Sequence, residues 1–299
     1  MNYLLHLVIY LNIYVIVALS LNVVVGYSGL LTLAHAGYFA IGSYVYALTS
    51  LKLGWGFLPS VMLGILVSAL LSLAVSLPAW RFKGDFFVLI SLTVQAFLFT
   101  VFYNWHKPSA ELGTLTNLTN GPFGIAGIPN PAIFGIKCDT IGSIAVLASI
   151  ITIFCGFLTW LLLSSPWGRL LKSIRDDELA TRGLGKNVQL AKIQLFTFSC
   201  GMAAVAGAIY ASYVSYIDPS TASLDHSILM LCMVIVGGVG NFRGPLVGAF
   251  ILLAIPEALR FAHVPDTMAA NLRLLAYGLL LVVMMHFRPQ GLAGQYRIE

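Results

Sequence analysis

The sequence predicts an all-α protein that crosses a membrane several times and forms a single domain over residues 1–299. Hydrophobic residues make up 59% of the chain and charged residues only 9%, whereas soluble domains are about one quarter charged. Long apolar runs recur along the chain and none alternates like a barrel strand, so helices remain as the spanning structure. A span needs about 20 mainly apolar residues. We expect about nine spans, at residues 3–25, 31–50, 57–78, 86–105, 142–164, 193–216, 228–240, 245–260 and 269–286.

The distribution of lysine and arginine predicts the orientation of these spans. Basic residues are enriched in cytoplasmic loops. With the N-terminus outside and the C-terminus inside, most of the sixteen basic residues face the cytoplasm, and the reverse orientation inverts that ratio. Because these residues are spread over loops between apolar runs, topology explains them better than nucleic-acid binding. The cytoplasmic set is Arg81, Lys83, Arg169, Lys172, Arg175, Arg182, Lys186, Lys192, Arg243, Arg288 and Arg297, which leaves Lys52, Lys107, Lys137, Arg260 and Arg273 outside.

The most charged stretch is residues 165–192, which we call the loop segment. Placing it in a bilayer would cost roughly 25 kcal/mol, so we expect it in the cytoplasm. The pattern predicts a short helix that is capped by Asp176 or Asp177 and ends at Gly183 or Gly185. Two interpretations stay open. The helix can transmit force to a docked protein, or the segment can be a connector that rests on anionic lipid headgroups.

Side chains on this predicted helix have a definite arrangement. Glu178 and Arg182 are four residues apart, in the favourable order for an ion pair. The spacing places an apolar face beside these charges. That face consists of Leu179, Ala180, Gly183 and Leu184.

Three stretches interrupt the apolar pattern. Residues 26–44 combine four glycines with Ser28, Thr32 and His35, which is typical either of a tight helix–helix contact or of a broken helix along a polar path. His35 is expected to be an interhelical donor or, less simply, a ligand or proton relay. The external loop at residues 106–139 is either a lid or docking surface, or a simple connection. Residues 234–250 form a glycine-rich turn. The candidate path residues are Ser28, Thr32, His35, Gln95, Gly237 and Gly240.

Several kinds of chemistry have no motif in this chain. There is no H-E-x-x-H sequence, no cluster of cysteine and histidine, and no paired carboxylates within the spans, so we expect neither an enzyme nor a metal site. No Walker A loop is present, because the nearest string, ATRGLGKN, has Ala180 and Asn187 at positions that require glycine and serine or threonine. The acidic residues lie at loops or span ends, which weakens an ion-driven mechanism.

Six motifs in order resemble the branched-chain amino acid ABC transporter permeases, and specifically the LivM-type subunit. They are GYSGLLTLAHAGYFAIGSY, LPAWRFKGDFFVLISLT, LTNGPFGIAGIP, SPWGRLLKSIRDDELATRGLGKNVQLAK, VIVGGVGNFRGPLVGA and RPQGL. The resemblance covers nearly the whole chain. It implies a multi-pass permease of the bacterial inner membrane that imports branched-chain amino acids by alternating access. Some members of this family carry urea, amides or other amino acids.

The resemblance also implies partners and a coupling element. The partners would be a homologous second permease, two cytoplasmic ATP-binding subunits that hold ATP and Mg, and a periplasmic or surface substrate-binding protein. The coupling element is similar to the E-A-A-x-x-x-G loop of ABC importers. Ala180 and Gly185 fit that spacing, whereas Leu179 and Thr181 depart from it and Glu178 lies one residue early. The coupling residues implied are Arg175, Asp176, Asp177, Glu178, Leu179, Ala180, Gly183 and Gly185.

Two functions of other classes stay open. A secondary carrier would work alone with an ion gradient, and a membrane scaffold would show no dependence on a substrate. Membrane lipid is expected to surround the chain in every case. No cofactor is expected in the chain itself.

Overall fold

Helices make up most of this structure, a computed structural model that describes residues 2–79, 85–107, 109–114, 116–133, 136–261, 266–288 and 290–294. Each of the nine predicted apolar runs contains a helix. The predictions for Arg81, Lys83 and Arg297 lie outside the described residues. The helices of the bundle are α1 (Asn2–Ser28), α2 (His35–Lys52), α3 (Phe57–Ala79), α4 (Asp85–Asn104), α5 (Ile141–Ser164), α8 (Val188–Val214), α9 (Leu224–Gly237), α10 (Gly244–Phe261) and α11 (Asp266–Phe287).

Among the described residues, five helices are long and apolar enough to cross a membrane, namely α1, α3, α4, α5 and α8. The chain is therefore a multi-pass membrane protein. The shorter α9 has 14 residues, which corresponds to about 21 Å against a hydrocarbon core of about 30 Å. Nine complete spans remain a prediction.

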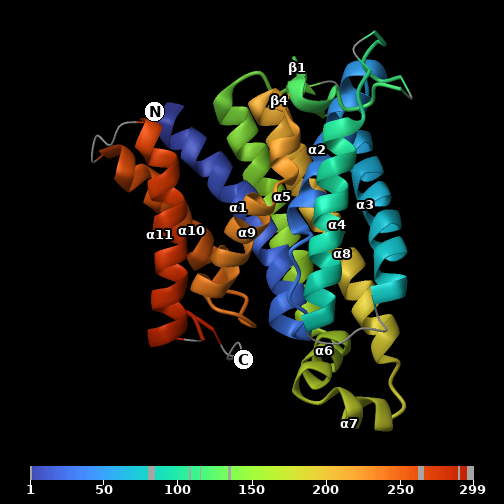
Figure 1. Cartoon of the computed structure of the whole chain (residues 1–299), viewed down its shortest axis with the longest axis vertical. Coiled ribbons are helices and arrows are strands. Elements are labelled where there is room, and N and C mark those ends of the chain that lie inside the picture. The colour runs from blue at the N-terminus through green and yellow to red at the C-terminus, as the bar shows by residue number, and fades with distance from the viewer. Residues whose placement is uncertain are drawn as a thin grey trace.

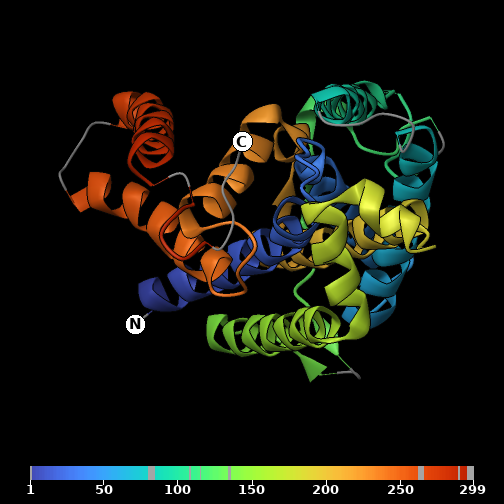
Figure 2. The ribbon, with the colours of Figure 1, turned by 90° about the horizontal axis from the view of Figure 1, so that it is seen from below.

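The helices surround two central elements, α2 and α8, which pack closely against each other. Helix α1 crosses the bundle obliquely and contacts α5 and α8 (Figure 1). Seen from below, α10 and α11 lie at the left of the bundle, and α3 and α4 lie at the right (Figure 2). This arrangement buries α1 and α2 along much of their length, whereas α3 and α5 expose large apolar side chains where lipid would lie.

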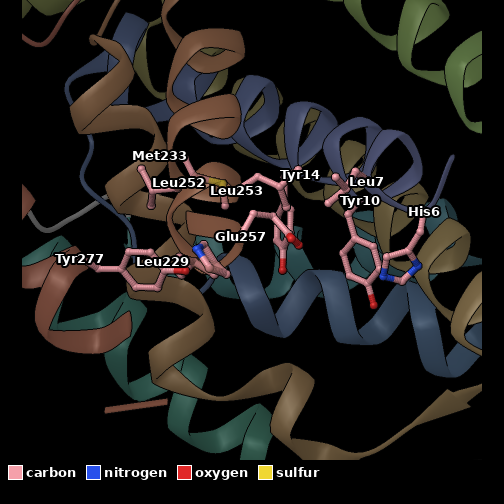
Figure 3. Close-up of a pocket in the computed structure, with 11 residues that line it drawn as sticks. His6, Leu7, Tyr10, Tyr14, Leu229, Met233, Leu252, Leu253, Glu257 and Tyr277 are labelled. Carbon is pink, nitrogen blue, oxygen red and sulfur yellow. The ribbon is translucent and has the colours of Figure 1, made fainter. Parts of the chain in front are cut away.

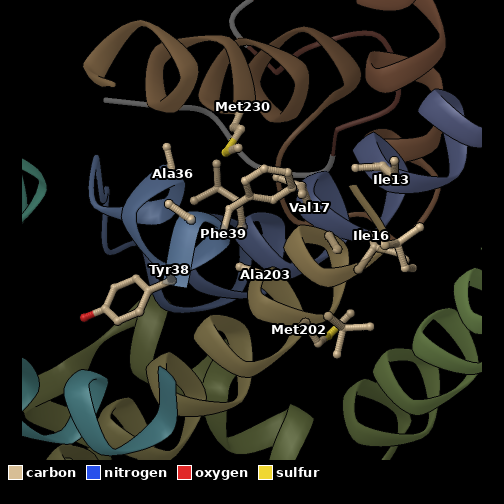
Figure 4. Packing of buried hydrophobic residues seen from close by; sticks show 14 of the residues in the cluster. Ile13, Ile16, Val17, Ala36, Tyr38, Phe39, Met202, Ala203 and Met230 are labelled. Carbon is tan, nitrogen blue, oxygen red and sulfur yellow. The ribbon is translucent and has the colours of Figure 1, made fainter. Parts of the chain in front are cut away.

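The core is filled by apolar side chains from helices that are far apart in the sequence. Ile16 and Val17 of α1, Phe39 of α2, Ala203 of α8 and Met230 of α9 are all at most 3% exposed and belong to one cluster (Figure 4). The cluster combines small and β-branched side chains with aromatic rings. Such packing makes the relative positions of α1, α2, α8 and α9 well defined.

The two ends of the bundle differ. The short helices α6 (Pro166–Asp176) and α7 (Glu178–Gly183) project from one end, and the N-terminus lies toward the other (Figure 1). At that second end, β1 (Ile125–Ala126) pairs with β4 (Tyr216–Ile217), and β2 (Ala132–Ile133) pairs with β3 (Ile136–Lys137). These short antiparallel pairs depart from the all-α prediction. They occur in connections outside the helices, where backbone groups must find partners of their own.

Candidate functional site

The loop segment folds into α6 and α7 because its sequence supplies a cap for each helix. The Ser165 hydroxyl accepts hydrogen bonds from backbone N–H groups in the first turn of α6. The Asp177 carboxylate caps α7 by accepting from the N–H of Ala180 at 3.0 Å. Helix α7 ends at Gly183, and Gly185 follows with a φ of +74°, which suits glycine. The predicted acidic cap and glycine stop are confirmed.

Glu178 ties α7 to the start of α8. Its carboxylate lies 2.5 Å from the guanidinium of Arg182 and 2.8 Å from the ammonium of Lys192. The predicted ion pair with Arg182 is confirmed, and the contact with Lys192 joins the short helix to a bundle helix. Because all three groups are partly exposed, each pair contributes no more than about 1 kcal/mol. The pairs therefore orient α7 more than they stabilise it.

The inner face of α6 is attached to the bundle by apolar contacts. Leu171 and Ile174 are buried in a small cluster with Val23 and Tyr27 of α1 and Leu195 of α8. The cluster is separate from the main core. A displacement of α6 would therefore act on the end of α1 and the start of α8 at the same time.

Arg175 adds a polar contact at the same place. Its guanidinium donates to the carbonyl oxygen of Val25 at 3.3 Å and to that of Gly26. Both carbonyls belong to the last turn of α1, where backbone acceptors lack partners within the helix. A cation is also favoured at a helix C-terminus by the helix dipole. The loop segment is thus joined to α1 by both apolar and charged groups.

The outer face of α7 is exposed. Leu179 is 70% exposed and Leu184 is 78% exposed, and Ala180 and Gly183 beside them are exposed as well. A Cβ added at Gly183 or at Gly185 would meet no atom within 4 Å. The four residues Leu179, Ala180, Gly183 and Leu184, which we call the outer face, thus form a small apolar patch on a charged segment.

The first candidate path region contains a break between two helices. Helix α1 ends at Ser28 and α2 begins at His35, four residues after the start of the predicted span. Nε2 of His35 lies 2.7 Å from Oγ of Ser20. Since Ser20 precedes the end of α1 by about 12 Å along the helix, residues 29–34 must turn back along α1, and α2 begins inside the bundle. Residues 29–34 thus separate two helices. The predicted tight helix–helix contact is supported, because a Cβ at Gly42 would overlap the carbonyl oxygen of Ala204 in α8. A broken helix within the membrane stays a prediction.

Polar groups at this break bond to protein atoms. The hydroxyl of Ser28 donates to the carbonyl of Val24 at 2.8 Å, and Oγ1 of Thr32 accepts from the N–H of Ala34 at 3.3 Å. His35 is buried, and among the described residues its Nδ1 has no hydrogen-bond partner. The bond to Ser20 favours an interhelical role for this histidine. A polar path along the break stays a prediction.

Gln95 of α4 joins this break to a second irregular segment. Its Oε1 accepts from the N–H of Gly37 in the first turn of α2 at 2.9 Å, and its Nε2 donates to the carbonyls of Ala222 and Ser223. These carbonyls lie at the end of the short 3₁₀ helix η2 (Pro219–Ala222). Gln95 also lines a cavity of about 250 Å³. Irregular backbone at membrane depth is tolerated when it is bonded in this way.

We expect Gln95→Leu to lower the free energy of unfolding by about 3 kcal/mol, because buried backbone groups lose a side-chain partner. Thermal unfolding of the purified protein in detergent measures the change. The matched control is Thr100→Val on the same helix, since this exposed hydroxyl bonds only to the carbonyl of Ala96. Equal midpoints for the two variants would contradict the role of Gln95.

The second candidate path region is the turn after α9, which Asn22 of α1 clamps. The N–H of Gly240 donates to Oδ1 of Asn22 at 3.0 Å, and Nδ2 of Asn22 donates to the carbonyl of Asn241 at 3.0 Å. A Cβ on Gly26 would lie 2.6 Å from the nitrogen of Gly240. The turn can therefore reach α1 only because position 26 has no side chain.

The chain after α11 closes the other side of this turn. The N–H of Leu292 donates to the carbonyl of Val236 at 3.0 Å, and that of Ala293 donates to the carbonyl of Gly237 at 2.9 Å. The amide of Asn241 in turn donates to the carbonyl of Ala293 at 2.7 Å. The R-P-Q-G-L motif thus leads into a segment that satisfies the last carbonyls of α9.

The structure places the predicted path residues at two positions. Thr32, His35 and Gln95 lie around the start of α2, whereas Gly237 and Gly240 lie at the turn beside α1. The hydrogen bonds of Asn22 to this turn were not predicted, although an amide side chain in an apolar span indicates bonding to a neighbouring segment. In the part of the chain that is described, no group of three or more histidine, cysteine or acidic residues is placed to hold a metal ion.

Comparisons with known proteins relate the chain to membrane permeases by sequence. The family described as "Branched-chain amino acid transport system / permease component" matches residues 3–285. The high-affinity branched-chain amino acid transport system permease protein LivM of Salmonella typhimurium is 30% identical over 308 residues, which cover 95% of this chain and 68% of the relative.

Two further relatives extend the comparison. The probable branched-chain amino acid transport permease protein LivM of Methanocaldococcus jannaschii is 24% identical, with 96% of this chain and 92% of the relative covered. The autoinducer 2 import system permease protein LsrC of Salmonella paratyphi B is 27% identical, with 69% of this chain and 61% of the relative covered. No solved structure matches the chain.

Proposed function

Because the chain belongs to the branched-chain amino acid transport permease family, we propose that it is the membrane subunit of an ABC importer for branched-chain amino acids. The observation that carries the proposal is similarity to LivM over 95% of the chain. A separate feature supports it, because the loop segment is joined to α1 and still exposes an apolar face. The subunit would sit in the bacterial inner membrane.

An ABC importer of this kind requires several partner proteins. A second homologous permease completes the pore, two ATP-binding subunits hold ATP and Mg, and a periplasmic or surface protein delivers the amino acid. The chain has no Walker A loop of its own. Energy for import would therefore come from these ATP-binding subunits.

The proposed topology has nine spans, with the N-terminus outside, the C-terminus inside, residues 165–192 in the cytoplasm and residues 106–139 outside. The ends of the bundle support it. The end with α6 and α7 carries eight described basic residues, against five elsewhere, as expected for a cytoplasmic side. The eight are Arg169, Lys172, Arg175, Arg182, Lys186, Lys192, Arg243 and Arg288.

The mechanism is alternating access driven through the loop segment. Closure of the ATP-binding subunits would push on the outer face of α7. Arg175 and the buried face of α6 would pass this displacement to the end of α1. Asn22 and Gly26 would carry it on to the turn at Gly240, and so to α9 and α10. The breaks at residues 29–34 and 238–243 would then act as hinges.

Reconstitution in liposomes tests this proposal. We expect the complete complex with its binding protein to take up leucine, isoleucine and valine only when ATP is present on the cytoplasmic side. The chain by itself should transport nothing in a proton or sodium gradient. Uptake by the chain alone would instead identify a secondary carrier, and no dependence on any substrate would identify a scaffold.

The substrate has one specific alternative. The similarity to the autoinducer 2 import permease LsrC over 69% of the chain makes autoinducer 2 the second candidate. Competition with unlabelled leucine, isoleucine, valine, urea, a short amide and autoinducer 2 distinguishes these substrates. Competition by leucine, isoleucine and valine alone is the expected result.

A further inference from the structure

A partly open cavity of about 180 Å³ lies between α1 and the group formed by α9, α10 and α11 (Figure 3). It belongs to the half of α1 that contains the N-terminus, away from α6 and α7 (Figure 1). An apolar cavity of about 150 Å³ can hold benzene. This one therefore has room for a compact molecule of the size of an amino acid.

One wall of the cavity is aromatic. His6, Tyr10 and Tyr14 follow each other at intervals of four residues, so they lie on one face of α1. The ring centroids of His6 and Tyr10 are 4.8 Å apart, and those of Tyr10 and Tyr14 are 6.2 Å apart. Tyr213 of α8 supports this wall, because its hydroxyl lies 2.5 Å from Nδ1 of His6. Tyr277 closes the cavity from α11.

The cavity also contains a carboxylate. Glu257 of α10 lines it beside the tyrosines and accepts a hydrogen bond from the hydroxyl of Tyr3. Both ion pairs found in the described residues involve Glu178, so no described lysine or arginine forms an ion pair with Glu257. The nearby Arg260 instead lies over the ring of Tyr3, at 5.0 Å from its centroid. The carboxylate is therefore available to an external cation.

The remaining lining is apolar. Leu229 and Met233 come from α9, and Leu252 and Leu253 come from α10. Figure 3 shows these side chains grouped together, with Glu257 and the α1 tyrosines beyond them. The cavity thus combines an apolar region with a region of rings, hydroxyls and one carboxylate.

We propose that this cavity binds the transported amino acid. The ammonium group pairs with Glu257 and lies against the faces of Tyr10 and Tyr14, an arrangement that aromatic rings favour for cations. The branched side chain contacts Leu229 and Met233. Hydroxyl and imidazole groups of the aromatic wall donate to the carboxylate of the ligand. This assignment rests on the proposed import function and adds a ligand site to it.

Two other cavities in the described structure lack this combination. The cavity of about 310 Å³ between α2, α3 and α4 has a lining of mainly apolar side chains, such as Leu71, Phe97 and Trp105. Its chemistry suits a lipid chain. The cavity beside Gln95 has an amide that is already bonded to Gly37 and Ala222. Neither is lined by a charged group.

Direct binding to the complete complex, purified without its substrate-binding protein, tests the site. The probes are leucine and 4-methylpentanoate, which keeps the carbon skeleton but lacks the ammonium group. We expect Glu257→Gln to weaken leucine binding about tenfold or more, the loss expected for a charged hydrogen bond, and to leave 4-methylpentanoate unchanged. Tyr14→Leu should weaken leucine binding about threefold or more. The matched controls are Glu111→Gln and Tyr103→Leu, both outside the cavity.

A variant that fills the cavity tests the site even if the variants above fail to assemble into the complex. Leu229→Phe adds volume without changing charge and should abolish binding of both probes. If the wild-type complex imports leucine but Glu257→Gln and Leu229→Phe bind it normally, the site is wrong and the import function stands. If the wild-type complex imports no branched-chain amino acid, the proposed function fails and this assignment falls with it.

Discussion

Replacing Leu179 and Leu184 together by aspartate is expected to reduce leucine uptake by the complete complex at least about thirtyfold. Both side chains belong to the outer face of α7 and are more than two thirds exposed. Burying a leucine side chain fully contributes about 1.5–3 kcal/mol, and a charge in its place would remain unpaired. The ATP-binding subunits should also no longer copurify with the permease.

The folded state should tolerate this change, because substitutions at exposed positions usually alter stability by less than about 0.5 kcal/mol. The control is Leu53→Asp. This leucine is 58% exposed and directly follows the C-terminal end of α2. The control variant should leave copurification unchanged. Normal copurification and uptake in the double variant would favour the alternative, a connector that rests on lipid headgroups.

Gly207→Val is expected to lower the free energy of unfolding by about 3 kcal/mol, the upper range for overpacked cores. A Cβ at Gly207 of α8 would overlap the carbonyl oxygen of Phe39 in α2, and one at Gly42 would overlap that of Ala204. The hydroxyl of Ser43 also donates to the carbonyl of Gly207 at 2.9 Å. Backbone atoms cannot move aside as a flexible side chain can, so the two helices would have to separate.

Thermal unfolding in detergent measures this effect, with Gly278→Val as the matched control. Gly278 also lies in a helix, but a Cβ there meets no atom within 4 Å. Gly207→Ala and Gly278→Ala form a milder pair if the valine variant does not fold. Equal midpoints within the alanine pair would show that α2 and α8 are not held at this distance.

Local structure in the loop segment could be predicted well. The cap at Asp177, the stop at Gly183 and the pair of Glu178 with Arg182 depend on residues within one or two helical turns. The contact of Glu178 with Lys192 could not be predicted, because it depends on how α7 folds back toward α8. The same holds for Arg175, whose carbonyl partners are about 150 residues away in the chain.

The breaks between helices were predicted only in part. Glycine, serine and histidine in residues 26–44 indicated an irregular segment, but the start of α2 at His35 depends on neighbours in three other helices. Gln95 and Ser227 bond to the first turn of α2, and Ser20 bonds to His35. None of these partners is recognisable from spacing.

The aromatic wall could have been found from the sequence. His6, Tyr10 and Tyr14 have helical spacing within the first apolar run. The spacing alone does not show what they face. Only the packing of α10 against α1 places Glu257 opposite them.

Apolar composition and run length determined that the chain is a membrane protein made of helices, because backbone groups in lipid must bond within their own segment. That requirement is local and can be read from consecutive residues. Contacts such as Asn22 with Gly240, or Glu257 with the tyrosines of α1, join residues more than 200 positions apart. They depend on which helices become neighbours, so only the tertiary structure defines the route from the loop segment to α1 and the cavity beside it.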